Sequence, residues 1–225
     1  PSPEVQPLFR TNPEAFLSRK IVVCEGKTEL GLLRGLDEAW TKSGQPFAVE
    51  GTALADGGGC TTVGGIAQSF RALAYQTAVF ADSDRPLDVP RETLEAEGIL
   101  VVLWDGEIAT EDRIFIDLPW AGVVATVELA ITEHGEEHVR QQLAATLKIS
   151  PKDIPADVDS WREVKPEAKL RQALGETARS KNVSWFKRVD RAAALGAILA
   201  GYLDEIKETD LARKIGEVRS WVFNG

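Results

Sequence analysis

The sequence predicts an α/β fold in which helices cover a mostly parallel sheet and a helical insertion follows the sheet. Short apolar runs alternate with amphipathic helical patterns over roughly the first hundred residues, which is typical of parallel strands joined by helices. After Trp104 the strand signal largely stops, and helical patterns interrupted by prolines continue to about residue 180. We therefore expect a core of parallel strands flanked by helices that carries a helical subdomain.

The individual elements are predicted from apolar periodicity and from turn residues. Asn12 followed by Pro13 is typical of a helix start with its N-cap. Strands are expected at 21–24, 47–54, 77–81 and 99–104, and helices at 13–18, from 28 to about 43, around 66–73 and at 90–97. The expected division is a tail or linker at 1–12, the core at 13–110, the helical insertion at 111–180, and a return to the core at 181–225. In this last segment we expect a strand at 183–186 and helices at 191–206 and 210–222.

Composition bounds the class of protein. The 225 residues carry a net charge of −9 and are 44% hydrophobic, which excludes a disordered chain, a collagen and a disulfide scaffold. Neither a membrane span nor a signal peptide is expected, and the two cysteines, Cys24 and Cys60, suit free thiols in a reducing cytosol, hence a cytoplasmic protein. The chain has no methionine, from which we expect a portion of a longer protein. Its acidity argues against nonspecific coating of nucleic acid but not against a nucleic-acid enzyme with a local basic patch.

Acidic residues follow two of the predicted strands at the edge where parallel α/β sheets bind ligands. Glu25 ends the first strand, Asp82 and Asp84 end the third, and Glu29 lies in the first turn of the following helix. Four converging carboxylates repel one another unless cations neutralise them, and an all-oxygen ligand set selects Mg²⁺ or Mn²⁺. Two such ions are the usual apparatus for attack on a phosphodiester. Taken singly, each acid also suits an ordinary helix start or turn.

These residues carry a family resemblance. The segment Ile-Val-Val-Cys-Glu-Gly-Lys-Thr-Glu at 21–29, followed by Asp-Ser-Asp at 82–84, resembles the Toprim domain of topoisomerases, bacterial primases and related nucleases. The second acid, Glu29, and the long helical segment are most similar to the OLD (overcoming lysogenisation defect) nucleases, over about residues 15–115 and again near residue 187. The resemblance implies metal-dependent DNA cleavage and an ABC-type ATPase domain ahead of the Toprim domain. Glu25-Gly-Lys-Thr lacks the Gly-rich stretch of a Walker A loop, so we expect that ATPase domain to be absent here.

The same resemblance implies two further site residues. An additional acidic ligand is expected in the loop after the fourth strand, for which we choose Glu111 over Glu107, while a simple helix-start acid is an equal alternative. A lysine is expected at the site from the C-terminal segment, for which we choose Lys187, with Arg188 and Lys181 as runners-up. A compact cation beside the metals could stabilise the charge that develops on the phosphate, and a surface lysine is the alternative.

Three other patterns carry weaker signals. Asp56-Gly57-Gly58-Gly59 is expected to be a loop near the same sheet edge. The pattern His134-Gly-Glu-Glu-His138 fits an inverted zinc-protease motif, but Gly135 weakens the helix and an exposed acidic helix is preferred. A third set is basic and concentrates late in the insertion, where it could contact phosphates or simply face solvent: Lys165, Lys169, Arg171, Arg179, Lys181, Lys187 and Arg188.

Together these patterns predict a Toprim endonuclease that cleaves DNA by two-metal hydrolysis with water as the nucleophile. The predicted metal ligands are Glu25, Glu29, Asp82, Asp84 and Glu111, and the predicted catalytic residues are Glu25 and Lys187. Expected cofactors are two Mg²⁺ or Mn²⁺ ions. Expected partners are DNA, the absent ABC-type ATPase domain and, by family analogy, a helicase, with no membrane. Two alternatives stay open, namely a primase-like nucleotidyl transferase and a non-catalytic Toprim module for DNA binding or assembly.

Overall fold

The computed structural model describes residues 5–181 and 183–224 and is built on a four-stranded parallel sheet. The strands are β1 (Lys20–Cys24), β2 (Thr52–Asp56), β3 (Gln76–Ala81) and β4 (Leu100–Leu103), in the order β2-β1-β3-β4. Cys24 lies opposite Asp56 on one side and Phe80 on the other, so the strands end together at one edge. The predicted α/β architecture with a parallel sheet is confirmed.

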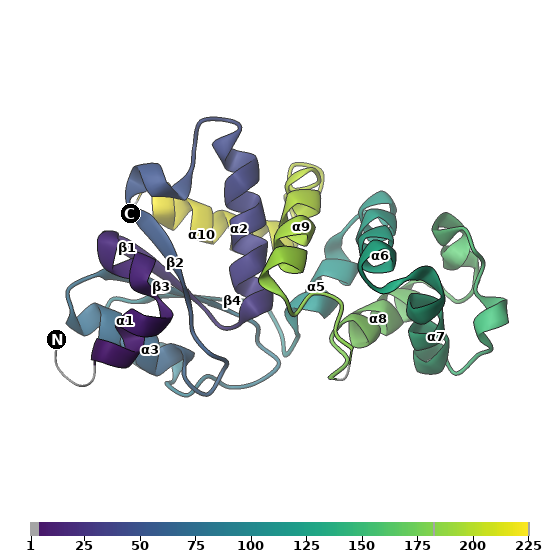
Figure 1. The fold of residues 1–225 in the computed structure, drawn as a ribbon, viewed down its shortest axis with the longest axis horizontal. Coiled ribbons are helices and arrows are strands. Elements are labelled where there is room, and N and C mark those ends of the chain that lie inside the picture. Colours follow the sequence, from purple (N-terminus) through teal and green to yellow (C-terminus); the bar gives the residue numbers. More distant parts are fainter. Residues whose placement is uncertain (1–4, 182, 225) are drawn as a thin grey trace.

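Helices cover both faces of the sheet because alternate strand residues point to opposite sides. Val22 and Phe80 face α2 (Lys27–Thr41) and α10 (Asp210–Asn224), whereas Val23 and Val79 face α1 (Val5–Thr11), η1 (Pro13–Leu17), α3 (Val63–Ala72) and α4 (Arg91–Ala96). Figure 1 shows α2 and α10 on one side of the strands and α1 and α3 on the other. The strands are therefore buried on both faces.

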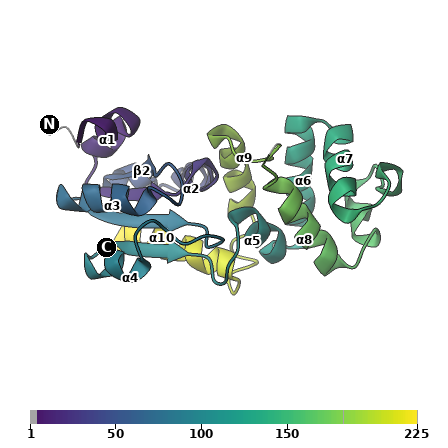
Figure 2. The ribbon, with the colours of Figure 1, turned by 90° about the horizontal axis from the view of Figure 1, so that it is seen from below.

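A helical lobe stands beside the sheet. It contains α6 (Trp120–His134), α7 (Glu136–Leu147) and α8 (Glu167–Ala178), with two short 3₁₀ turns, η3 (Pro151–Asp153) and η4 (Val158–Glu163), between α7 and α8. Helices α5 (Thr110–Asp117) and α9 (Val189–Ala200) lie between this lobe and the sheet (Figures 1 and 2). The expected helical insertion after the fourth strand is thus present.

Helix α9 returns to the core by packing closely on α2. A side chain at Gly35 would overlap the carbonyl oxygen of Ala193, and one at Gly196 would overlap the carbonyl oxygen of Leu32. Glycine on both helices lets their backbones approach to a distance that any larger residue would prevent. This contact brings the segment just before α9 to the N-terminal end of α2, where the first acidic motif lies.

Several sequence-based expectations need correction. Residues 5–11, expected to belong to a tail or linker, form α1, and residues 1–4 lie outside the described part. Asn12 does not cap a helix with its side chain; its amide bonds the backbone of Asp56 instead and so pairs the outer edge of β2. The strand expected at 47–54 is split into η2 (Phe47–Glu50) and β2, because Gly51 adopts a left-handed turn. Residues 183–186 form a turn segment, not a strand, and Trp185 and Phe186 are buried there as core side chains.

Two other expectations concern cysteines and membranes. Cys24 is buried in β1 and Cys60 is half-buried, and both thiols are free. In the described part of the chain, no helix is long and apolar enough to cross a membrane.

Candidate active site

All six predicted site residues line one cavity at the carboxyl end of the sheet. The cavity has a volume of about 570 Å³ and its wall includes Glu25, Glu29, Asp82, Asp84, Glu111 and Lys187. Sequence reasoning did not single out several further residues of the wall, among them Lys27, Cys60 and Arg85. Lys27 lies between Glu25 and Glu29, and Arg85 follows Asp84. The position of Lys27 and Arg85 beside the acidic motifs is the sequence feature that indicates a place in the wall.

Glu25 and Asp82 meet at the ends of two neighbouring strands. A carboxylate oxygen of Glu25 accepts a hydrogen bond from the backbone N–H of Asp82 at 3.2 Å, and the backbone N–H of Glu25 donates to Phe80 at 2.9 Å. These bonds extend the β1–β3 pairing past the last strand residue. Asp84 is exposed on the same turn, two residues from Asp82. The expected convergence of strand-end acids is therefore present in the geometry.

Glu29 and Glu111 form the buried floor of the cavity. Glu29 is 5% exposed and accepts hydrogen bonds from the backbone N–H of Gly26 at 3.1 Å and from the hydroxyl of Thr110 at 2.8 Å. Glu111 is 4% exposed and accepts a hydrogen bond from the hydroxyl of Thr28 at 3.3 Å. Each glutamate is thus held by a threonine of the other helix start, which ties α2 to α5.

The carboxyl groups have raised pKa values because they are removed from water and face one another. Burial first, and then the charges of Glu25 and Glu29, raise the pKa of Asp82 from 3.8 to about 9. Burial and the charge of Glu29 raise the pKa of Glu25 from 4.5 to about 7, and the same two causes raise that of Glu111 from 4.5 to about 7. A cation bound among these groups would lower their pKa values again, because its charge favours the ionised carboxylates.

The donor atoms are of the type that a hard divalent cation binds, since all are carboxylate oxygens. Among the described residues, the Oδ1 atom of Asp82 is buried and has no hydrogen-bond partner, although it lies beside Glu25 and Asp84. A buried acceptor without a partner is costly, and a cation is the partner that a group of carboxylates admits. Among residues 5–181 and 183–224, no three His, Cys, Asp or Glu side chains are already close enough to enclose a metal ion. Binding would therefore draw the carboxylates together.

Lys187 faces the buried glutamates, and its neighbour does not. The positive charge of Lys187 lowers the pKa of both Glu29 and Glu111, against the stronger effect of burial. Arg188 instead forms an ion pair with Asp190 at 2.7 Å and lines a separate groove. Lys181, the other runner-up, also lines the cavity.

Comparison with known proteins covers the segment that carries the first acidic motifs. Residues 16–84 match the family model described as "Overcoming lysogenization defect protein-like, TOPRIM domain". The chain contains an OLD-like Toprim domain. The expected resemblance is thus confirmed for the segment that carries Glu25, Glu29, Asp82 and Asp84, while Glu111 and Lys187 lie outside the matched residues.

One solved structure that is similar to the chain is described as the "C-terminal region of the Xanthomonas campestris pv. campestris OLD protein phased with platinum". The identity is 19%, the match covers 87% of this chain and 99% of that chain, and the TM-score is 0.40. No curated protein matches the chain.

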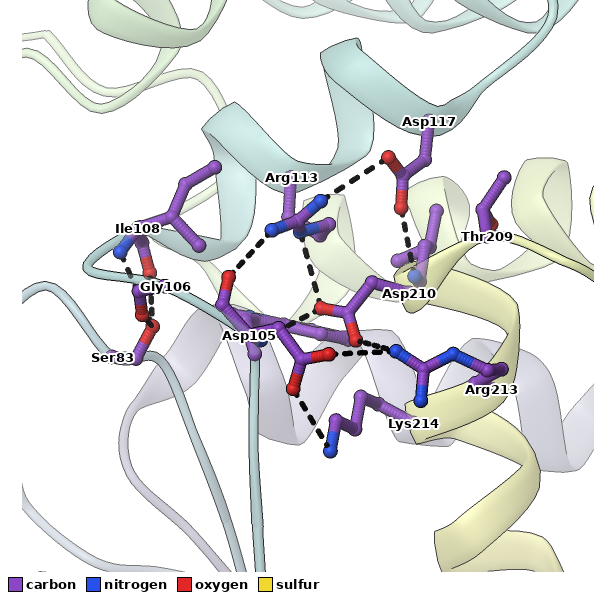
Figure 3. A network of polar contacts seen from close by, with 12 residues as sticks. Ser83, Asp105, Gly106, Ile108, Arg113, Asp117, Thr209, Asp210, Arg213 and Lys214 are labelled. Carbon is purple, nitrogen blue, oxygen red and sulfur yellow. Dashed lines mark hydrogen bonds and ion pairs between the residues drawn. The ribbon is translucent and has the colours of Figure 1, made fainter.

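Ser83 fixes the turn of the Toprim domain that carries its two aspartates. Its hydroxyl donates to the carbonyl of Gly106 at 2.5 Å and accepts from the backbone N–H of Ile108 at 3.2 Å, and its own N–H donates to the carbonyl of Ile108 at 3.1 Å (Figure 3). The turn after β3 is thereby bound to the loop that leads into α5. The residue between Asp82 and Asp84 therefore sets the position of both.

A polar network holds that loop and α5 against the C-terminal helix. The guanidinium of Arg113 pairs with Asp210 at 3.3 Å, and Asp210 accepts a hydrogen bond from the backbone N–H of Asp105 at 2.8 Å. Asp117, further along α5, accepts from the backbone N–H of Leu211 at 2.8 Å (Figure 3). Since α5 also carries Glu111, the first turn of α10 helps to position the buried floor of the Toprim cavity.

The glycine loop after β2 folds over the end of β1. Gly57 donates to the carbonyl of Cys24 at 2.7 Å, and a side chain at this position would lie 2.7 Å from that oxygen. Gly59 donates to the carbonyl of Glu25 at 2.7 Å. Gly58, Gly59 and Asp56 line the cavity, so the loop lies at the predicted sheet edge.

The other sequence candidates fall partly at the cavity and partly away from it. Glu107 is exposed and does not line the cavity, unlike Glu111. His134 ends α6 and His138 lies in α7, so Gly135 divides the zinc-protease pattern between two helices. Of the basic residues, Arg179, Lys181 and Lys187 line the cavity, while Arg171 binds backbone carbonyl groups at the end of α5, at Phe115 and Leu118.

Proposed function

We propose that this chain is a metal-dependent DNA endonuclease that hydrolyses phosphodiester bonds with two Mg²⁺ or Mn²⁺ ions. The observation that carries the proposal is the unpartnered buried Oδ1 of Asp82 within a group of carboxylates. The basic side chains around the same cavity, from Lys27, Arg85, Arg179, Lys181 and Lys187, support a polyanionic substrate. An acidic centre with a basic rim suits a phosphodiester together with the cations that it shares.

In this proposal, the acids hold the metals and the chain supplies no nucleophilic side chain. Glu25, Glu29, Asp82, Asp84 and Glu111 would ligate the ions. Bound there, such ions activate a water molecule for attack and stabilise the leaving oxygen.

Glu25 is the central ligand, because it lies beside both Asp82 and Glu29. Lys187 would offset the charge that grows on the phosphate, since its ammonium group lines the cavity near the two buried glutamates. Thr28 and Thr110 orient the two buried glutamates through their hydroxyl groups.

The proposal is tested by incubating the chain with supercoiled plasmid and Mn²⁺. We expect nicked or linear product from the wild type and none from Asp82→Asn, because the amide side chain carries no charge to hold the cation. Glu107→Gln is the matched control and should cut at the wild-type rate, since its side chain is exposed outside the cavity. Incorporation of nucleotides without cleavage would favour a primase-like transferase, and neither activity would favour a non-catalytic module.

The expected partners beyond DNA follow from the family resemblance alone. An ABC-type ATPase domain and a helicase stay predictions, and co-purification of the chain with a separately expressed ATPase domain would test the first of them.

A further inference from the structure

A second groove adjoins the acidic cavity and has a different electrostatic character. It has a volume of about 520 Å³ and lies along α2 and the start of α9, with Lys27 in the wall of both cavities. Because this lysine lines both, the two hollows adjoin at the start of α2. The groove therefore begins where the proposed catalytic site ends.

Helix geometry explains why the groove is basic. Lys27 and Arg34 are seven residues apart on α2, which is about two helical turns, so both side chains stand on the same face about 10 Å apart. Arg188 comes from the residue before α9 and lines the same groove. The glycines that allow α2 and α9 to pack closely also bring these three cations, from two segments remote in the sequence, to one surface.

The cations are available to a ligand. Lys27 and Arg34 are exposed, and within the described part of the chain neither forms an ion pair with an acidic side chain. Arg188 pairs with Asp190, but this pair is exposed, and such pairs contribute little and exchange readily. Glu38 lies in the wall as well, so the groove holds three positive and two negative side chains in a chain whose net charge is −9. The first turn of α9 also lies in the wall, at Val189, and the free N–H groups of a helix start favour anions.

We propose that this groove binds the sugar-phosphate backbone of DNA next to the phosphate that occupies the acidic cavity. The inference rests on the proposed nuclease function and assigns the substrate a direction across the molecule, from the sheet edge past Lys27 towards Arg34. A polyanion with regularly spaced charges suits cations placed at intervals along two adjoining hollows. Arg34 and Arg188 contact phosphates flanking the scissile bond and take no part in the chemistry.

The test is DNA binding by the double variant Arg34→Ala/Arg188→Ala, measured by fluorescence anisotropy on a duplex of about 20 base pairs without divalent metal. Each phosphate contact contributes about 0.9 to the salt slope, or about eightfold in affinity at 0.1 M salt, so losing two should weaken binding up to about 60-fold. The slope of log K against log salt should fall by about 1 to 2. Arg91→Ala/Arg162→Ala removes two exposed, ion-paired arginines outside both cavities and is the matched control.

The result that overturns the inference is an affinity within twofold of that of the control variant together with an unchanged salt slope. Displacement of the duplex by polyglutamate of equal charge, at equal concentration, would also overturn it, because the groove would then suit an acidic protein segment. Thermal unfolding of both variants at the wild-type temperature confirms that each is folded. If the wild type fails to cut plasmid while the groove variant still loses affinity, the nuclease proposal fails and the DNA groove stands. If the wild type cuts and the groove variant binds DNA as the control does, the nuclease proposal stands and the DNA groove fails.

Discussion

Replacing Glu111 by glutamine is expected to stabilise the metal-free protein increasingly as the pH rises. Glu111 is 4% exposed, and its burial together with the charge of Glu29 raises its pKa from 4.5 to about 7. Between these two values the folded protein binds more protons at this group than the unfolded chain does. Wild-type stability therefore falls with rising pH through this interval, and the variant, which carries no ionisable group, does not share that loss.

The size of the effect follows from the two pKa values. With 4.5 unfolded and about 7 folded, the charge of Glu111 costs about 0.8 kcal/mol at pH 5 and about 3 kcal/mol at pH 8. Glutamine retains an oxygen that can accept the hydrogen bond from Thr28, but its buried N–H groups lack a partner, which costs about 1 kcal/mol at every pH. The change in stability between pH 5 and pH 8 does not include that constant cost and amounts to about 2.5 kcal/mol.

The assay is thermal unfolding in EDTA at pH 5 and at pH 8. For a chain of this length, about 2.5 kcal/mol corresponds to a relative gain for Glu111→Gln of roughly 5–10 °C between the two pH values. Glu107→Gln is the control, because Glu107 is exposed and should give no such gain. Added Mn²⁺ should raise the unfolding temperature of the wild type more than that of Glu111→Gln. Equal pH dependence in the two glutamine variants would refute the placement of Glu111 among the facing carboxylates.

Three further outcomes are expected. Lys187→Ala should lower the turnover rate by about 10²–10³ at saturating DNA, since one electrostatic contact to the transition state is lost, while Arg188→Ala should keep its turnover; steady-state kinetics would contradict this if the two variants behaved alike. Ser83→Ala should raise the Mn²⁺ concentration needed for half-maximal cleavage, because the turn between the two aspartates loses its side-chain bonds to Gly106 and Ile108. Ser69→Ala is the control and should leave that concentration unchanged, because it loses only a bond within α3. Titration with Mn²⁺ followed by calorimetry should give two ions per chain, and a single site would argue against two-metal hydrolysis.

Much of the acidic site was predictable because it depends on local sequence. The apolar run before Glu25 and the one before Asp82 each predict a buried strand, and parallel strands end at one edge of a sheet. Asp82 and Asp84 are expected on one turn for the same local reason. Glu111 and Lys187 were chosen by family resemblance, since no pattern around them indicates which remote segment they contact. Lys187 and Arg188 are adjacent and both cationic, so spacing alone could not separate them.

Predictions from the pattern of a single segment were wrong where a contact with a remote segment decides the structure. Asn12 has the sequence of a helix cap, but its amide binds Asp56, 44 residues away, because the edge of β2 otherwise leaves backbone groups unpaired. The apolar residues 183–186 have the sequence of a strand, but they follow α8 at a place where Trp185 and Phe186 fill the core. Burial of these two aromatic side chains holds the segment in place, and its residues do not pair with the described strands.

The sequence by itself determined the alternation of four strands with helices and the presence of acids at two strand ends, because each depends on residues within one or two turns of one another. Only the tertiary structure decided that Glu111 meets Thr28, that Lys187 faces the buried glutamates, and that Arg34 and Arg188 share a groove. Those contacts join segments that are remote in the sequence. They are selected by the packing of α2, α5 and α9. The glycines of α2 and α9 and the buried side chains of all three helices set how closely they approach.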